Sequence, residues 1–217
     1  MNRFMKRFTY IFLLLFFASI EAQEVAILKY NGGGDWYANP TAVPNLVKFT
    51  NQETNSNISE NIKTVTAGNE DIFSYPIVFM TGHGNVVFSN SEIDNLRNYL
   101  TSGGFLHISD NYGLDKFIRR ELKKLFPKNT LEEIPSNHPI FDQQFKFSNG
   151  IPKIHEHDKK TPKGYGIFYE GRLVVFYDHE TDLSDGWEDQ SIHNNSPKVR
   201  EKALQMGSNI IHYAFSN

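Results

Sequence analysis

Short apolar runs alternate with segments of helical periodicity along most of the chain. Apolar runs between glycines and polar turns favour strands, and we expect strands at residues 24–30, 61–66, 76–81 and 105–109. Apolar side chains spaced three and four positions apart predict helices, here over residues 41–55, 89–102 and 114–126. Ser89 and Glu92 have capping-box spacing at the start of the second helix. The first half of the chain therefore alternates between strands and helices.

The second half of the chain has fewer regular elements. It predicts a short strand at 131–134, a hairpin of strands 164–170 and 172–177, and a closing helix over 198–215. Residues 136–163 and 178–197 are polar and are expected to be loops. Alternation of this kind predicts an α/β fold whose mainly parallel sheet carries helices on both faces. Because no repeat or linker interrupts the pattern, we expect residues 23–217 to form one domain.

The first 22 residues follow a different pattern. Arg3, Lys6 and Arg7 precede an apolar run over 8–20, which is too short to span a bilayer as a helix. A basic start, an apolar centre and a small residue, Ala22, predict a secretory signal peptide over residues 1–22. A retained N-terminal anchor is the alternative. We therefore expect an exported protein, periplasmic or associated with the cell envelope, without a membrane span once the signal is cleaved.

The amino-acid composition argues against some kinds of binding partner and excludes some kinds of catalytic chemistry. The net charge is −3 and the chain has no block of lysine and arginine, which argues against a nucleic-acid partner. The chain contains no cysteine, so it forms no disulfide and has no thiolate nucleophile. A chain of 217 residues is long enough to bury a core without such cross-links.

Polar and aromatic side chains follow the predicted strands at the points where they end. These residues are Asp35 and Trp36, then His83 and Asn85, then Asp110, Asn111 and Tyr112, and finally Asp178, His179 and Glu180. Since the carboxyl ends of parallel strands share one edge of a sheet, we expect a binding crevice there. A small polar molecule is the expected ligand.

Two of these residues are candidates for catalysis. His83 lies between Gly82 and Gly84, which would let a ligand approach the backbone while the imidazole acts as acid or base. A solvated turn is the alternative reading. Asp110 stands where a strand meets a helix, and its carboxylate could face a metal or substrate or cap the helix. Both roles can hold together, since either Asp110 or Asn111 could cap while the other faces the site.

Two polar segments in the second half could bind a divalent metal ion or a ligand. His155 and His157 point the same way in an extended segment and offer two nitrogens to a metal, although a solvated loop is the alternative. Asp185 and Glu188 flank Trp187 in an acidic segment, 182–189, that lacks the spacing of a calcium-binding EF-hand loop. Asp185, Trp187 and Glu188 are candidate ligand contacts, and the alternative is an exposed acidic turn in which Trp187 packs onto the core.

Six segments together resemble an uncharacterised bacterial domain-of-unknown-function family, common as an exported protein in Bacteroidota. They are Asn31-Gly-Gly-Gly-Asp-Trp-Tyr37, Met80-Thr-Gly-His-Gly-Asn85, Gly103-Gly-Phe-Leu-His-Ile-Ser-Asp-Asn-Tyr-Gly113, Ser136-Asn-His-Pro-Ile-Phe141, Ile154-His-Glu-His-Asp158 and Asp185-Gly-Trp-Glu-Asp189. That family is grouped with the class I glutamine amidotransferase-like superfamily. The resemblance implies a flavodoxin-like fold and no established activity.

The same resemblance places Asp110 where glutamine amidotransferases carry their cysteine nucleophile. Without a cysteine, glutaminase chemistry is excluded. The ThuA-like branch also lacks this cysteine and is associated with sugars, so it implies a carbohydrate ligand, which Trp36, Tyr37, Tyr112 and Trp187 could stack against. We expect a crevice that binds such a ligand and supports metal-assisted or acid–base hydrolysis. A non-catalytic module that binds a cell-envelope protein is the alternative.

Overall fold

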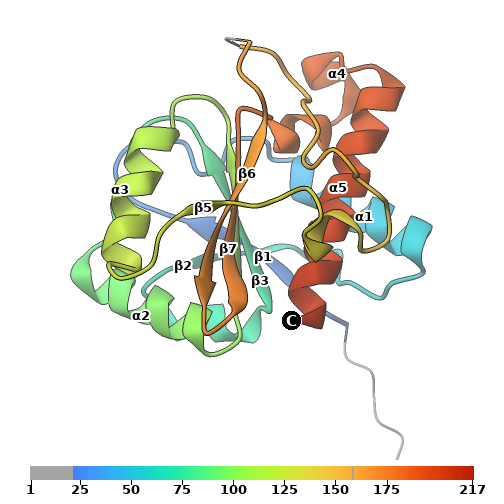
Figure 1. The fold of residues 1–217 in the computed structure, drawn as a ribbon. Coiled ribbons are helices and arrows are strands. Elements are labelled where there is room, and N and C mark those ends of the chain that lie inside the picture. The colour runs from blue at the N-terminus through green and yellow to red at the C-terminus, as the bar shows by residue number, and fades with distance from the viewer. Residues whose placement is uncertain (1–21, 158) are drawn as a thin grey trace, which may run out of the picture.

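The computed structural model describes residues 22–157 and 159–217, and it contains a seven-stranded sheet (Figure 1). The strand order is β2-β1-β3-β4-β7-β6-β5. The parallel part comprises β1 (Val25–Lys29), β2 (Lys63–Thr66), β3 (Ile77–Gly82), β4 (Phe105–Asp110) and β7 (Arg172–His179). Strands β6 (Lys163–Tyr169) and β5 (Glu132–Glu133) continue the sheet antiparallel. The predicted α/β fold with a mainly parallel sheet is confirmed.

Helices cover both faces of the sheet, as the alternation predicts (Figure 1). Helices α1 (Ala42–Thr54) and α5 (Pro197–Ser216) pack on one face, against inward side chains such as Phe79 and Phe176. Helices α2 (Asn90–Thr101) and α3 (Asp115–Leu125) pack on the other face, against Met80 and Ile108. Strands β3 and β4 are buried along their whole length because both of their faces are covered.

Local sequence accounts for several element boundaries. The Ser89 hydroxyl accepts the Glu92 backbone N–H while the Glu92 carboxylate accepts the Ser89 N–H, so the predicted capping box forms. Glu170 and Gly171 both have positive φ, as the two central residues of a tight β6–β7 turn require. Ser196 caps α5, and Pro197 occupies its first turn.

Short helices occupy parts of the two segments for which the sequence predicts loops. They are η2 (Pro139–Phe141), η3 (Leu183–Gly186) and α4 (Gln190–His193), and a further one, η1 (Glu70–Ser74), lies between β2 and β3, where the sequence predicts no element. The alternative of an exposed acidic turn over 182–189 is wrong about exposure, because residues 181–188 are buried, but it is right that Trp187 packs onto the core. Trp187 causes this burial: its ring packs against Phe79, and its indole Nε1 donates to the Ala203 carbonyl of α5.

The predicted signal peptide lies, as far as residue 21, outside the described residues. Within the part of the chain that the structure describes, no helix has the length and apolar character needed to cross a membrane.

Candidate functional site

The side chains predicted from the strand ends do lie at one edge of the sheet. Gly82 pairs in register with Asp110 across β3 and β4, and Ser109 pairs with Asp178 across β4 and β7. They divide, however, into two groups with separate contacts. One is the pair Asp35–His83, and the other gathers around Asp185.

Asp35 and His83 form an exposed ion pair after β1 and β3. The Asp35 carboxylate accepts the His83 backbone N–H through one oxygen and lies 2.9 Å from His83 Nδ1 through the other. Burial alone would raise the pKa of Asp35, but the hydrogen bonds from His83 outweigh it and lower that pKa. Gly82 adopts φ +139° beneath the pair, where a Cβ would collide with the Tyr30 hydroxyl. The carboxylate therefore holds the imidazole in one orientation with its other nitrogen free of that contact.

Replacing His83 by alanine is expected to change the free energy of unfolding by less than about 1 kcal/mol. The His83 side chain is 54% exposed, and an exposed ion pair contributes little to stability. Thermal unfolding of the variant checks this expectation. A loss of several kcal/mol would show that His83 holds the loop together and would remove it as a candidate acid or base.

The other predicted residues near this pair have structural contacts. Asn85 donates to the Gly32 carbonyl and accepts from Arg120, so it ties the glycine loop to α3. Trp36 lies beneath the Lys29 ammonium and packs edge-on against the exposed ring of Tyr37. Trp36 and Tyr37 remain available as an aromatic surface for a ligand.

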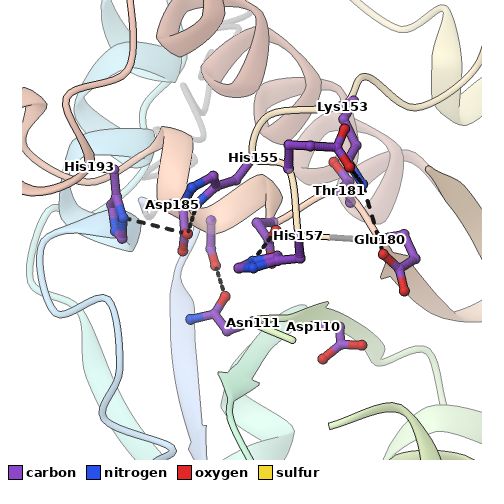
Figure 2. Close-up of polar contacts among 12 residues, drawn as sticks. Asp110, Asn111, Lys153, His155, His157, Glu180, Thr181, Asp185 and His193 are labelled. Carbon is purple, nitrogen blue, oxygen red and sulfur yellow. Dashed lines mark hydrogen bonds and ion pairs between the residues drawn. The ribbon is translucent and has the colours of Figure 1, made fainter. Parts of the chain in front are cut away.

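Three histidines and two aspartates form the second group, and they come from two separate loops (Figure 2). Its members are His155, His157, Asp182, Asp185 and His193. Asp185 Oδ2 lies 3.4 Å from His155 Nδ1 and 3.6 Å from His193 Nδ1. Asp182 Oδ2 lies 2.9 Å from His157 Nε2. The rings of His155 and His157 are 4.9 Å apart, so the prediction that they face the same region agrees with this geometry.

Buried hydrogen bonds position the two loops. The Thr181 carbonyl accepts the backbone N–H groups of Ile154 and His155, which fixes the histidine segment against the end of β7. Asp178, which is fully buried, lies 2.7 Å from His107 Nε2 and accepts the Ser109 hydroxyl at 3.1 Å. The backbone N–H of Leu183 also donates to Asp178, which anchors η3 and with it Asp185.

Asp182 is the most perturbed carboxyl group of this cluster. Burial, together with the negative charges of Asp185, Asp178 and Asp110, raises its pKa to about 8. Its Oδ2 atom is buried and takes part in no hydrogen bond, despite its short distance to His157. Asp182 also adopts φ +51°, a strained conformation for a residue other than glycine. Buried strain of this kind is typical of functional sites.

The residues at the end of β4 flank the cluster. Asp110 accepts the Leu114 N–H, just before α3, and the Tyr177 hydroxyl. The N-cap residue of α3 is Leu114 and no side chain caps the helix, so Asp110 does not take the predicted N-cap position. Burial raises the pKa of Asp110 despite these bonds, which act to lower it. Asn111 accepts the Ser184 hydroxyl, and Tyr112 stacks on His157 with ring centroids 4.5 Å apart. Asp110, Asn111 and Tyr112 thus border the cluster from β4.

The acidic segment contributes differently from the sequence expectation. Trp187, predicted as a ligand contact, is fully buried in the core, because its ring fills the space between β3 and α5. Glu188 accepts the backbone N–H and the hydroxyl of Thr41 through Oε1, while Oε2 lies 3.6 Å from His193 Nε2. The Glu188 carboxylate therefore lies on the side of the His193 ring that points away from Asp185.

Sequence reasoning missed Asn39, Asp182 and His193 as members of the site. Asn39 donates to Asp185 Oδ1 at 2.8 Å and also to the Ser184 hydroxyl. His193 stands in a segment without a motif, and the bonds of the Trp187 indole to Ala203 and of Arg200 to the Glu188 carbonyl hold that segment against α5. The repeated acids around Trp187 were the one available signal for this region.

Comparison with known proteins identifies the family. The family model described as Domain of unknown function (DUF4159) matches residues 24–215. The chain belongs to this family. This confirms the expected membership of an uncharacterised domain family, and the site above lies entirely within the DUF4159 domain. No curated protein matches the chain.

Proposed function

We propose that this DUF4159 protein is a metal-dependent hydrolase that acts on a small polar substrate at the carboxyl edge of its sheet. The metal ion would be divalent and held by His155, Asp185 and His193. The observation that carries the proposal is the convergence of these three ligand atoms, two nitrogens and one carboxylate oxygen, which lie within 4.8 Å of one another.

The spacing of the three atoms suits metal ligation better than hydrogen bonding. Ligands of a tetrahedral zinc ion at about 2.0–2.2 Å lie roughly 3.3–3.6 Å from each other. The two separations at Asp185, 3.4 Å and 3.6 Å, match that spacing. They exceed the range of about 2.7–3.2 Å of ordinary N–H···O bonds.

Neighbouring residues would orient the ligands, as is usual around metal ions. Glu188 Oε2 faces Nε2 of His193, which leaves Nδ1 of His193 directed at Asp185. Asn39 donates to the Asp185 oxygen that does not face the two histidines. The bond from Asn39 fixes the orientation of the Asp185 carboxylate, whereas Glu188, at 3.6 Å, makes no hydrogen bond to His193.

The local charge also favours a cation. The Asp182 carboxyl is surrounded by Asp185, Asp178 and Asp110, with Lys153 the opposing positive charge. A buried cluster of this sign is stabilised by a divalent ion or by protons. The buried Asp182 Oδ2 has the 2.9 Å ion-pair contact with His157 Nε2 and no hydrogen bond.

His155, Asp185 and His193 would hold the ion, and a zinc ion there would supply a bound water whose pKa is lowered toward 7. The residues of this chain would then position the substrate. His157 and Tyr112 form a stacked wall beside His155. Ser184 and Asn111 are buried and bonded to each other and to Asn39, so they support Asp185 rather than contact the substrate. Asp35–His83 would supply acid–base chemistry from the neighbouring strand end.

The proposal also includes a flavodoxin-like fold, a ThuA-like relationship and an exported location. The order β2-β1-β3-β4-β7 has the 2-1-3-4-5 pattern of flavodoxin-like sheets, which supports that classification. A ThuA-like relationship would make a carbohydrate the substrate. The exported location and an origin in Bacteroidota rest on residues 1–22 and on the sequence resemblance described above.

A non-catalytic envelope-binding module is the competing function. The two oxygens of Asp110 favour it, because each accepts a hydrogen bond from within the fold. At the position where the resemblance places a cysteine nucleophile, this chain would then have a residue with a structural role. This function requires no metal ion.

Metal content distinguishes the two functions. Purified chain, stripped with a chelator and dialysed against zinc, is expected to retain an ion that Asp185→Asn and His193→Ala both lose. His212→Ala, which changes a histidine of α5 bonded to Thr54, is the matched control and should retain the ion. Elemental analysis provides the measurement, and circular dichroism establishes that each variant is folded. Equal zinc in wild type and in both variants would contradict the proposal.

A further inference from the structure

A cavity of about 500 Å³ lies outside the candidate site, between residues 146–154 and helix α5 (Figure 1). Sites for small molecules typically measure about 300–1,000 Å³, so this volume is large enough for a ligand. Its walls include none of the proposed metal ligands, although Ile154 directly precedes His155 in the chain. A ligand of this cavity would therefore be distinct from the substrate of the candidate site.

The floor of the cavity is apolar. Ile151 and Ile154 are 6% and 9% exposed, and both belong to the core cluster beneath α5. Phe147 and Val199 are partly buried against the same cluster, and they line the cavity from the loop and from α5 respectively. Burial of one methylene group on such a surface strengthens binding about fourfold. The floor thus favours a ligand with an apolar chain.

The charged side chains of the walls are all basic. Among the described residues that line the cavity, Lys146, Lys153 and Lys202 are charged and none is acidic. Lys202 has no ion-pair or hydrogen-bond partner within the part of the chain that the structure describes. Lys146 lies 3.8 Å from Asp142, in a pair whose side chains are 72% and 63% exposed. Because such an exposed pair is weak, both of these ammonium groups are available to an anion.

Lys153 differs from the other two lysines, because groups of the protein already surround its ammonium. It donates to the Lys160 carbonyl at 3.0 Å and lies 3.7 Å from Glu156 and 3.8 Å from Glu180. The positive charge available to a ligand is therefore that of Lys146 and Lys202.

We propose that this cavity binds an amphipathic carboxylate, an anion with an apolar chain such as a medium-chain fatty acid. The chain would lie on Phe147, Ile151 and Val199, and the carboxylate beside Lys146 and Lys202. Charge complementarity decides the class, since a cationic amphiphile would meet two like charges and a small polar anion would gain nothing from the apolar floor. This inference goes beyond the proposed function and does not rest on it, because binding here requires no metal ion.

Isothermal titration calorimetry of the metal-free chain with octanoate tests the proposal. One octanoate is expected to bind per chain. Octylammonium, which has the same chain and the opposite charge, should bind at least tenfold more weakly. Butanoate, which is shorter by four methylene groups, should also bind at least tenfold more weakly. In NMR spectra, octanoate should shift the methyl resonances of Ile151 and Val199, which locates the bound chain.

Variants of the two lysines test the position of the carboxylate. Lys146→Gln and Lys202→Gln should each weaken octanoate binding about fivefold, as expected for the loss of one exposed ion pair. Lys48→Gln is the matched control, because it removes the charge of an exposed lysine on α1 that does not line the cavity, and it should bind like the wild type. Thermal unfolding establishes that each variant is folded.

Three results would overturn the inference. They are no binding of octanoate, equal binding of octanoate and octylammonium, and unchanged octanoate affinity in the double variant of Lys146→Gln and Lys202→Gln. None of them bears on zinc retention at Asp185, and loss of the zinc site in turn leaves octanoate binding intact. Failure of this inference and failure of the proposed function are therefore distinguished.

Discussion

Metal-free protein is expected to lose on the order of 5 kcal/mol of stability as the pH rises from about 4 to about 8, through Asp182 alone. The pKa of this carboxyl is raised from 3.8 to about 8 by burial and by the charges of Asp185, Asp178 and Asp110. Between those two values the folded state holds a proton that the unfolded state has released. The unfolded state therefore binds fewer protons, and stability falls with increasing pH.

Asp182→Asn isolates this contribution, because asparagine has the shape of the protonated carboxyl and does not titrate. The variant should be more stable than the wild type at pH 8 and similar to it at pH 4. Urea unfolding in the presence of a chelator at several pH values measures the difference. Asp142→Asn, at an exposed carboxylate 3.8 Å from Lys146, is the control and should follow the wild-type profile. A wild-type advantage at pH 8 would refute the shifted pKa.

Replacing Asp178 by alanine is expected to lower the free energy of unfolding by about 3–5 kcal/mol. Its carboxylate is the shared acceptor for His107, Ser109 and the Leu183 N–H, all within the core. Removal of one partner from a buried pair leaves the other groups without a bond, and this costs more than the pair itself contributes. Chemical denaturation of both proteins at pH 7 gives the measurement.

Asp178→Asn provides the comparison, since its carbonyl oxygen retains one acceptor position. We expect a loss intermediate between those of the wild type and the alanine variant. Because Asp178 also anchors η3, both changes should weaken metal binding at Asp185 in the same order. A loss below about 1 kcal/mol for Asp178→Ala would mean that the surrounding groups find other partners or water.

Much of the fold follows from local pattern. Burial on both faces makes β3 an apolar run, and amphipathic spacing with a capping box defines α2, so these elements are readable from neighbouring residues. The hairpin β6–β7 is similarly fixed by Glu170 and Gly171. The short helices η3 and α4 were missed because tertiary packing of Trp187, rather than local propensity, holds their segment against the sheet.

The sequence by itself determined the edge of the sheet where polar residues collect, since parallel strands must end together. It identified His155, Asp185 and Glu188 as candidates, and it excluded thiol chemistry through the absence of cysteine. Only the tertiary structure decided which of these side chains meet. His193 joins His155 at Asp185 because two loops remote in sequence are held by Thr181 and Asp178, contacts that no spacing in the chain encodes.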